Sequence, residues 1–275
     1  MPSIDLIAIL RSFLVVAGTI WTFLEAYSGL GAGNLSVPFW LFLSISLVGG
    51  TIFYAFDGLV LTGFLLSKAR IQTPYGTQIE ISFGDIFKKP GWIAIGVSDF
   101  FNSKVDERLI SSKSLHGISI KKYWEGNESL WQNQVNNSLR NIESIIVHRD
   151  LGNKRKYPIG TTAVVQFENI KFLYFALAEA NEQHITSNNA EGMIKSIRGM
   201  LKKARGYCSS DDLNLPLFGD GLARVELSKL VLIDLIITAI MEESRKGKVT
   251  DKINIVLLPS LKSKLNLKQI EKKWN

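Results

Sequence analysis

An uncharged apolar run in the N-terminal quarter constrains this chain more than any other feature. The segment VPFWLFLSISLVGGTIFYAF, from Val37 to Phe56, holds no charged residue. Because an α-helix rises about 1.5 Å per residue, a run of about 20 residues crosses a hydrocarbon core of about 30 Å. The run predicts a membrane-spanning helix, which we place at residues 37–58.

A second apolar stretch precedes it, at residues 6–27. It contains Arg11 near its start and Glu25 near its end, positions from which long side chains reach the membrane interface. A cleavable signal peptide would carry its positive charge at the extreme start and a small-x-small cleavage site before a folded domain, and the sequence shows neither. We therefore interpret this stretch as a second span.

The two spans are predicted to form a hairpin. The connection SGLGAGNLS, Ser28–Ser36, is a short glycine-rich turn that joins antiparallel helices. Arg11 lies at one end of the first span, while Lys68 and Arg70 follow the second. The positive-inside rule therefore places both chain ends in the cytoplasm and makes this a two-span protein of the inner membrane.

Asp57 interrupts the apolar pattern, which resumes as GLVLTGFLLS up to Ser67. Either the helix continues and the carboxylate faces a helix partner or water, or Phe56 marks the membrane boundary and Asp57 is interfacial. The sequence leaves both open. Small residues offer surfaces for close helix contact, namely Ser44, Ser46, Gly49, Gly50 and Gly63. A hairpin alone is too small to enclose a path, so a pore would need several copies.

We divide the chain into the hairpin, residues 1–70, and a cytoplasmic domain, residues 71–275. The charges of the hairpin cancel, so the net charge of +7 belongs to the domain. Much of the excess lies in a basic C-terminal tail, at Lys262, Lys264, Lys268, Lys272 and Lys273. We interpret the tail as solvated, with attraction to anionic membrane lipid as the alternative.

Composition also bears on the partners and the compartment. The sequence has no zinc-finger spacing, no RNP-like segment and no basic helix with interleaved aromatics, so we expect no nucleic-acid partner. Cys208 is the only cysteine, which suits a reducing compartment.

After residue 70, short β-type runs alternate with helical stretches, a pattern typical of a mixed or largely parallel sheet covered by helices. The predicted strands are Gln78–Phe83, Trp92–Val97, Thr162–Phe167, Phe172–Ala178, Asn214–Leu217 and Asn254–Leu258. The predicted helices are Glu128–Ile146, Ala190–Ala204 and Leu227–Glu242. The fold class expected is therefore a transmembrane hairpin followed by an α/β domain.

Familiar catalytic motifs are missing from the sequence. None of His116, His148 and His184 belongs to a helical zinc motif, so no metal site is expected. There is no G-x-S-x-G elbow, no phosphate loop ending in Gly-Lys-Ser/Thr and no G-x-G-x-x-G after the first strand. These absences argue against the common hydrolases, NTPases and dehydrogenases.

Two segments are suited to a phosphorylated ligand. In LPLFGDGLARV, Leu215–Val225, a strand ends at Gly219-Asp220-Gly221 and a helix begins soon after, so backbone N–H groups can face an anion. The second segment is IEISFGDI, Ile79–Ile86, followed by a strand that ends in Asp99-Phe100-Phe101-Asn102. Glycine at a strand-to-helix turn often serves conformation only, so neither segment decides a function alone.

Taken in this order, the segments resemble the macro domain, a fold that binds ADP-ribose and its derivatives. The resemblance implies that Asp85 in Gly84-Asp85-Ile86 receives the adenine amino group and that Asn102 lies near the distal ribose. It also implies that the diphosphate lies along Gly219, Asp220, Gly221 and Leu222. The other residues expected at this ligand site are Ile86, Phe100, Phe101, Val105, Phe218 and Arg224.

Two departures from the macro-domain pattern favour a binding protein over an enzyme. The glycine-rich first loop is replaced by Ser103-Lys104-Val105-Asp106, and the glycine that often closes the second loop is Arg224. An ADP-ribosyl hydrolase would need an open, glycine-lined approach to the distal ribose. We expect no catalytic residue and no cofactor, with Arg224 and Lys104 either contacting a charged group on the ligand or serving as ordinary surface charge.

Three motifs in order carry a closer resemblance: DFFNSKVDERLISSKSLHG from Asp99 to Gly117, KYPIGTTAVV from Lys156 to Val165, and LPLFGDGLARV. They look like the macro domain of the Thoeris antiphage ThsA family, in the type II form that joins it to a transmembrane hairpin. The resemblance implies a partner TIR-domain enzyme that makes an ADP-ribose-based signal from NAD, namely histidine joined to ADP-ribose. The macro domain would bind it, the protein would form homo-oligomers, and the hairpins would disrupt the membrane so that the infected cell stops growing.

Two alternatives remain open. The first is a membrane-tethered ADP-ribosyl hydrolase, in which Asp106 or Asp220 would serve as acid or base and the ligand would be turned over. The second is a tethered binding module that recruits ADP-ribosylated partners to the inner membrane. Replacing the hairpin with another anchor would preserve the recruitment function but abolish the effector function.

Overall fold

The computed structural model describes residues 6–30, 37–181, 184–219 and 227–275. Its chain divides into two compact units. The first, the hairpin unit, consists of Met1–Ala69 with Lys262–Trp274, and the second, the α/β unit, consists of Arg70–Leu261 with Asn275. The sequence assigned the whole C-terminal segment to the soluble domain, whereas the contacts group most of it with the hairpin.

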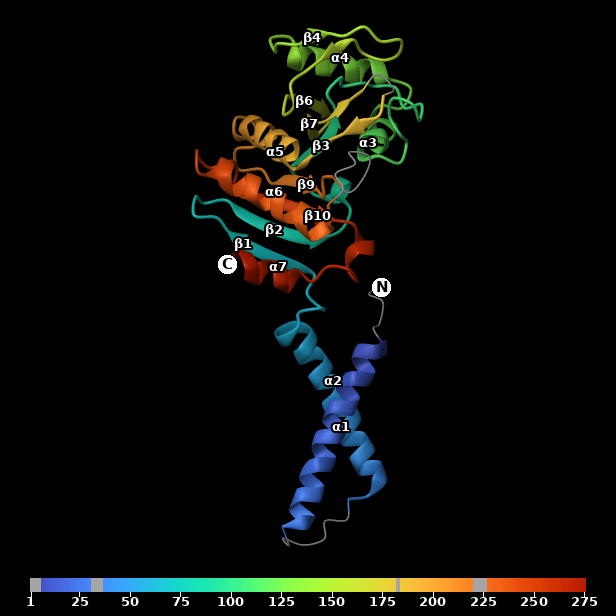
Figure 1. Ribbon diagram of the computed structural model, residues 1–275, viewed down its shortest axis with the longest axis vertical. Helices are drawn as coiled ribbons and strands as arrows, with labels where there is room; N and C mark the ends of the chain where they lie inside the picture. Colours follow the sequence, from blue (N-terminus) through green and yellow to red (C-terminus); the bar gives the residue numbers. More distant parts are fainter. Residues whose placement is uncertain (1–5, 31–36, 182–183, 220–226) are drawn as a thin grey trace. The chain divides into compact units, whose positions relative to one another are not determined.

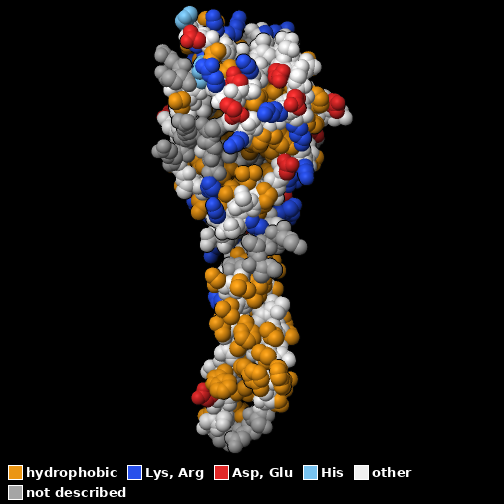
Figure 2. Space-filling view, turned by 90° about the vertical axis from the view of Figure 1, so that its right-hand side faces the viewer, with side chains coloured by type: hydrophobic (Ala, Val, Ile, Leu, Met, Phe, Trp, Pro, Cys, Tyr) orange, Lys and Arg blue, Asp and Glu red, His pale blue; other side chains and the backbone are white. Residues whose placement is uncertain are grey.

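The hairpin consists of α1 (Leu6–Gly29) and α2 (Phe39–Phe56), which continues as a π-helix, η1 (Asp57–Leu61). Both helices are long and apolar enough to cross a membrane, by length and composition. Figure 2 shows mostly hydrophobic side chains on the hairpin, and large ones such as Trp40 and Phe23 are about three-quarters exposed, at 74% and 73%. Large exposed apolar patches of this kind mark surfaces that contact a membrane or another protein.

Small residues bring α1 and α2 into close contact. Ser12 and Ser46 are fully buried between the helices, and a Cβ added to Gly50 would lie 3.0 Å from the Cα of Phe13. A Cβ added to Gly49 would likewise collide with a neighbouring valine. Three of the small residues predicted to allow close helix contact, Ser46, Gly49 and Gly50, therefore lie at the interface of α1 and α2. Ser44 differs, since its exposed hydroxyl donates to the carbonyl of Trp40 on its own helix.

The C-terminal tail is ordered, and its lysines are exposed or half-buried. It forms α7 (Leu267–Trp274), in which Leu267 and Ile270 are buried. Within the hairpin unit, the amide of Asn266 donates to the carbonyl oxygen of Thr62 at 2.6 Å. The tail is ordered because its leucines and isoleucine bury apolar surface, a gain that its net positive charge does not cancel.

The α/β unit is built on one main sheet with the strand order β1-β2-β10-β9-β3-β7-β6, in which β8 also pairs with β7 (Figure 1). Its strands are β1 (Lys68–Gln72), β2 (Gln78–Phe83), β3 (Trp92–Ser98), β6 (Thr162–Phe167), β7 (Ile170–Ala180), β8 (Thr186–Ser187), β9 (Leu213–Pro216) and β10 (Lys252–Leu257). Strands β2, β10, β9, β3 and β7 run parallel, while β6 and β8 are antiparallel to β7. The predicted mixed sheet is confirmed.

Helices cover both faces of this sheet. They are α3 (Leu115–Trp124), α4 (Glu128–Leu139), α5 (Ala190–Arg205) and α6 (Lys229–Ser244), with short 3-10 turns η2 (Ile86–Lys88) and η3 (Pro259–Leu261). On one face, Ile93 and Ile95 of β3 and Tyr174 of β7 pack with Trp124 of α3 and Trp131 of α4. The other face is covered by α5 and α6, which pack against each other (Figure 1). With both faces covered, the ends of the strands are the surfaces left for a ligand.

The predicted helix Glu128–Ile146 is wrong in its second part. Helix α4 ends at Leu139, and the next residues form β4 (Ile145–Ile146), which pairs antiparallel with β5 (Arg155–Lys156). The β-branched pair Ile145 and Ile146 favours an extended chain once a partner strand is present. Helix α3 was not predicted, although the side chain of Ser114 caps it by accepting the N–H of Gly117 at 3.0 Å.

Candidate ligand-binding site

The carboxyl ends of the parallel strands lie at one edge of the sheet. The order β2-β10-β9-β3-β7 places the residues after β2, β9 and β3 along this edge, although they are far apart in the sequence. In open α/β sheets, ligands bind in the crevice outside the carboxyl ends of the strands. The segments that the sequence selected for a phosphorylated ligand therefore converge on the expected edge.

A cavity of about 300 Å³, which we call the strand-edge cleft, lies at this edge. Its walls are the ends of β3 and β9, the start of α3 with the preceding loop, and parts of β7 and β8. Phe218 and Gly219, two of the residues proposed from the sequence for the ligand site, line it. Phe218 is itself buried edge-to-face against Phe175 at 5.0 Å between ring centroids. Gly219 has φ +85°, a left-handed conformation that favours glycine and turns the backbone at the cleft.

The N-terminus of α3 opens onto the strand-edge cleft. Ser114, Leu115 and His116 line the cleft, and Lys113 contributes a cation beside them. The N–H groups at a helix N-terminus and a nearby ammonium both favour an anion such as a diphosphate. Burial lowers the pKa of His116 to about 3, so this ring stays neutral near pH 7. Sequence reasoning missed Lys113 because α3 itself was not recognised.

Asp85 follows β2 at the same edge of the sheet. Its carboxylate accepts the N–H of Phe87 at 3.0 Å and caps η2, and the side chain remains exposed, so other oxygen lone pairs are free to accept from a ligand. Ile86, also predicted for the site, is buried in the hydrophobic core on the α3 and α4 face. Its side chain therefore supports the turn and does not present itself to a ligand.

Asn102 lies in the loop after β3, and a second asparagine fixes it. The main-chain N–H of Asn153 donates to Oδ1 of Asn102 at 2.8 Å. The side-chain amide of Asn153 donates to the carbonyl oxygens of Phe100 and Phe101, at 3.0 and 2.7 Å. Phe101 has φ +48°, an uncommon backbone conformation for a non-glycine residue, and these bonds hold it there.

The rings of Phe100 and Phe101 are buried, at 3% and 1% exposure. The guanidinium of Arg149 stacks on Phe100 with its Cζ 3.9 Å from the ring centroid, and it also pairs with Nδ1 of His184. Burial lowers the pKa of Arg149, an effect that the charge of Asp99 opposes. Neither Arg149 nor Asn153 was predicted, because their partners lie far away in the sequence.

Asp99 has a structural role at the end of β3. It is fully buried, and its Oδ1 accepts the N–H of Ala180 at 3.0 Å. Nζ of Lys156 lies 3.4 Å from its Oδ2. Burial raises the pKa of Asp99, although the Ala180 N–H and the Lys156 charge act in the opposite direction. Its hydrogen bond with Ala180 links the end of β3 to the end of β7.

The loop that replaces the glycine-rich segment is held by its own aspartate. Val105 forms an isolated bridge with Ile110, while Oδ1 of Asp106 accepts the N–H groups of Arg108 and Leu109 at 3.1 and 2.8 Å. Slight burial would raise the pKa of Asp106, but these two N–H groups and the charge of Lys104 keep it below its usual value. The other predicted ligand residues, Asp220, Gly221, Leu222 and Arg224, lie outside the described residues.

In the described ranges, which omit 182–183 and 220–226, no group of His, Cys, Asp or Glu side chains is placed to hold a metal ion. The strand-edge cleft thus offers amide, hydroxyl and ammonium groups around a helix N-terminus, a set of donors suited to binding phosphate oxygens.

A family profile described as "Thoeris protein ThsA, Macro domain" matches residues 79–258. This chain belongs to the ThsA macro-domain family. The match covers β2 through β10 and so includes every strand whose end forms the strand-edge cleft. A curated relative, the Thoeris protein ThsA of Bacillus amyloliquefaciens strain Y2, is 23% identical over 208 residues, which are 72% of this chain and 69% of the relative.

Solved structures agree with the fold of the ThsA macro-domain family. The Oceanobacillus iheyensis macrodomain with ADP has a TM-score of 0.52 at 13% identity, covering 75% of this chain and 95% of that one. A glycine-to-valine mutant of the same macrodomain, with ADPR, has a TM-score of 0.52 at 14% identity, covering 75% and 97%. At these identities the likeness shows the macrodomain fold and nothing finer.

Proposed function

We propose that this chain is a membrane effector of antiphage defence whose macro domain senses an ADP-ribose-derived signal. The observation that carries the proposal is the union, in one chain, of a ThsA-family macro fold with a strand-edge cleft and two helices long and apolar enough to cross a membrane. A partner TIR-domain enzyme would supply the signal, histidine joined to ADP-ribose. Binding would assemble the protein, and the assembled hairpins would disrupt the inner membrane and stop growth.

The edge of the sheet supports binding of such a ligand. Asp85, after β2, has free carboxylate lone pairs for the adenine amino group, and Asn102, in the loop after β3, would serve the distal ribose. Gly219, Lys113 and the N-terminus of α3 line the strand-edge cleft, where the diphosphate would bind, and Asp85 and Asn102 lie outside its lining. Asp220, Gly221, Leu222 and Arg224 complete this proposed site.

We propose a binding protein and not a hydrolase. Asp106, the acid or base of the rival enzyme, already accepts two main-chain N–H groups and has a lowered pKa. A general acid at neutral pH needs a raised pKa, so Asp106 is unsuited to that role. Asp220, the other candidate of the rival enzyme, lies outside the described residues.

The membrane part of the proposal sets a thermodynamic condition. A ligand that binds the free and assembled forms equally well shifts nothing, however tightly it binds. The signal must therefore bind the assembled form more tightly than the free form. Both chain ends would lie in the cytoplasm, where a TIR product accumulates.

Titration calorimetry of the full chain in lipid nanodiscs tests the ligand. We expect binding of histidine-linked ADP-ribose, with ADP-ribose and NAD as comparisons, and recovery of the ligand uncleaved. Asp85→Ala and Gly219→Glu should abolish binding. Asp85→Ser is the sharper control, because a serine oxygen can still cap η2 but carries no charge for the adenine amino group. If none of the three compounds binds, the ligand assignment is wrong, and cleavage of the bound compound would favour the hydrolase.

Dye release from liposomes tests the effector step. Sealed vesicles that carry the full-length protein should release dye when the signal is added, and vesicles that carry the Asp85→Ser variant should not. A second chain, in which an unrelated two-helix anchor replaces residues 1–61 and leaves β1 intact, should bind the signal without releasing dye. Equal growth arrest by both chains in cells would instead support the recruitment module.

A further inference from the structure

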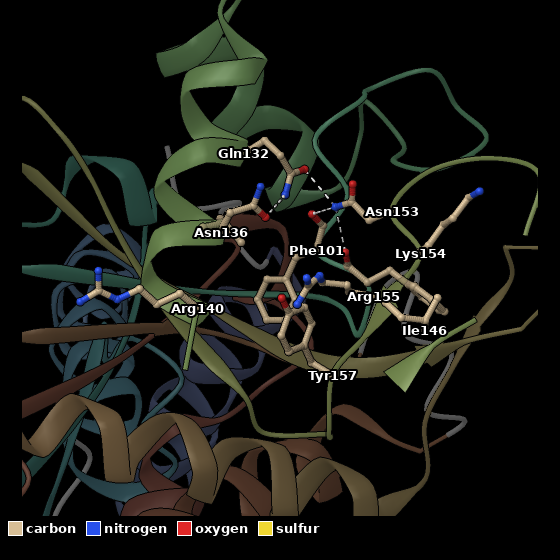
Figure 3. A pocket seen from close by; sticks show the side chains of 11 residues that line it. Phe101, Gln132, Asn136, Arg140, Ile146, Asn153, Lys154, Arg155 and Tyr157 are labelled. Carbon is tan, nitrogen blue, oxygen red and sulfur yellow. Dashed lines mark hydrogen bonds between the residues drawn. The ribbon is translucent and has the colours of Figure 1, made fainter. Parts of the chain in front are cut away.

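A second pocket of about 570 Å³ is lined in part by Phe100 and Phe101. Its walls come from α4, from the β4–β5 hairpin and from the loop after β3 (Figure 3). No lining residue is shared with the cleft. We call it the hairpin pocket, after the β4–β5 hairpin and not the membrane hairpin, and it shares only Phe100, Phe101 and Asn153 with the residues of the candidate site described above.

The charge of the hairpin pocket is of one sign. Its ionisable lining side chains, tyrosine aside, are Arg140, Lys154 and Arg155, with no aspartate or glutamate among the lining residues. Figure 3 shows Arg140 and Lys154 on opposite rims, with Arg155 between them near Tyr157. In the part of the chain that the structure describes, no salt bridge joins these cations to a carboxylate. Cations gathered without counter-charges repel one another, and an anion relieves that repulsion.

Amide groups in the pocket are held in place by their own hydrogen bonds. The side chain of Gln132 donates to Oδ1 of Asn136 at 3.1 Å and accepts from the amide of Asn153 at 3.0 Å. This leaves the Asn136 amide nitrogen as a donor on the same wall as Arg140 (Figure 3). Phe101 and Tyr157 form the apolar floor, edge-to-face with ring centroids 5.5 Å apart.

The same asparagine links the hairpin pocket to the proposed signal site. Asn153 lines the pocket, and its main-chain N–H donates to Asn102, the residue expected at the distal ribose. Only Asn153 would therefore separate a group bound in the pocket from Asn102, which would hold the distal end of the signal.

We propose that the hairpin pocket binds a carboxylate- or phosphate-bearing group of a small molecule. Arg155 and Arg140 would pair with the anion, the Asn136 amide would donate to it, and a planar part would lie on Tyr157 and Phe101. Such a group has two sources. The first is the substituent carried on the distal ribose of the signal, and this alternative rests on the proposed function. The second is a separate small anion, and this alternative is independent of the proposed function.

The test measures the affinity of the full chain in neutral-lipid nanodiscs for three probes: ADP-ribose, histidine-linked ADP-ribose and inorganic pyrophosphate. Pyrophosphate is also added after the protein has been saturated with ADP-ribose. The pocket variant is Arg140→Gln with Arg155→Gln, both exposed positions where glutamine disturbs no described ion pair. Lys195→Gln with Lys202→Gln, at two exposed lysines of α5, is the matched loss of two charges outside the pocket.

If the substituent occupies the pocket, the pocket variant binds the histidine conjugate about tenfold more weakly and ADP-ribose as the wild type does, as expected for loss of charge-assisted hydrogen bonds. If a separate anion occupies it, the variant loses pyrophosphate binding about tenfold while affinity for the conjugate is kept. The proposal is overturned if all three probes bind variant and wild type within about twofold. A wild type that binds pyrophosphate but neither nucleotide refutes the proposed function and leaves the pocket standing.

Discussion

The guanidinium of Arg11 on α1 pairs with the carboxylate of Asp57, where α2 passes into its π-helical end. Asp57 is buried, at 4% exposure, while more than half of the Arg11 side chain is exposed. The helix continues beyond Phe56, and the carboxylate faces a helix partner, the first of the two arrangements that the sequence left open. An ion pair is how an apolar helix tolerates such a charge.

This pair predicts coupling between the two positions. Asp57→Asn leaves Arg11 without its counter-charge and should destabilise the hairpin, and adding Arg11→Gln should recover part of the loss. Because Arg11 is half exposed, we expect a coupling of about 1 kcal/mol and not the larger value of a fully buried pair. A double-mutant cycle on unfolding of the full chain in mixed micelles measures it. Additive effects of the two substitutions would mean that the pair does not hold the helices together.

Close packing of α1 on α2 predicts a difference between two glycines. Gly50→Ala brings a Cβ to 3.0 Å from the Cα of Phe13, whereas a Cβ at Gly18 meets nothing within 4 Å. We expect Gly50→Ala to cost about 1–3 kcal/mol through overpacking, and Gly18→Ala to be neutral or stabilising because alanine favours a helix. The same micelle unfolding experiment reports both. Equal stability of the two variants would contradict the packing described for this interface.

Gly152 sits against Asn102 and predicts an effect on ligand binding. Its φ is +78°, and an added Cβ would lie 2.5 Å from Oδ1 of Asn102. Gly76 has nearly the same backbone, with φ +79°, but nothing within 4 Å of an added Cβ. Both alanine variants should lose about 1 kcal/mol of stability to the backbone, and Gly152→Ala alone should weaken ADP-ribose binding by displacing Asn102. Calorimetry with both proteins decides, and equal affinities would remove Asn102 from the site.

Burial of His116 predicts how stability depends on pH. Its pKa falls from about 6.5 in the unfolded chain to about 3 in the fold, where the ring packs on Trp131 and Tyr174. The folded state therefore binds fewer protons, so this contribution to stability is complete above pH 6.5 and is lost as pH falls towards 3. Well below pH 6.5 the slope is about 1.4 kcal/mol per pH unit.

His116→Phe should remove that slope. We expect the difference in Tm between pH 7.5 and pH 5 to be smaller in this variant than in the wild type. His148→Gln, at an exposed position, should keep the wild-type difference. The burial argument fails if His116→Phe loses as much stability on acidification as the wild type does.

Local patterns account for the parts of the fold that were predicted well. The strand Gln78–Phe83 is found as predicted, and the helix predicted at Ala190–Ala204 ends one residue later, at Arg205. Both are encoded by the periodicity of neighbouring side chains. The helix after Glu128 was extended too far, because Ile145 and Ile146 continue an apolar pattern and only the pairing with Arg155 shows them to be a strand. Asp85 was predicted from the resemblance to the macro domain, whereas Lys113 and Asn153 carry no local pattern.

The sequence by itself determined the two apolar helices, the alternation of strands and helices, and the family, because these depend on the order and hydrophobicity of residues close together in the chain. Only the tertiary structure decided that Asn153 fixes Asn102, that Arg11 meets Asp57, and that the hairpin pocket gathers its cations. Asn102 and Asn153 are 51 positions apart, and Arg11 and Asp57 are 46. The physical reason is that such contacts form when packed elements bring side chains together, and no spacing along the chain specifies which distant groups will meet.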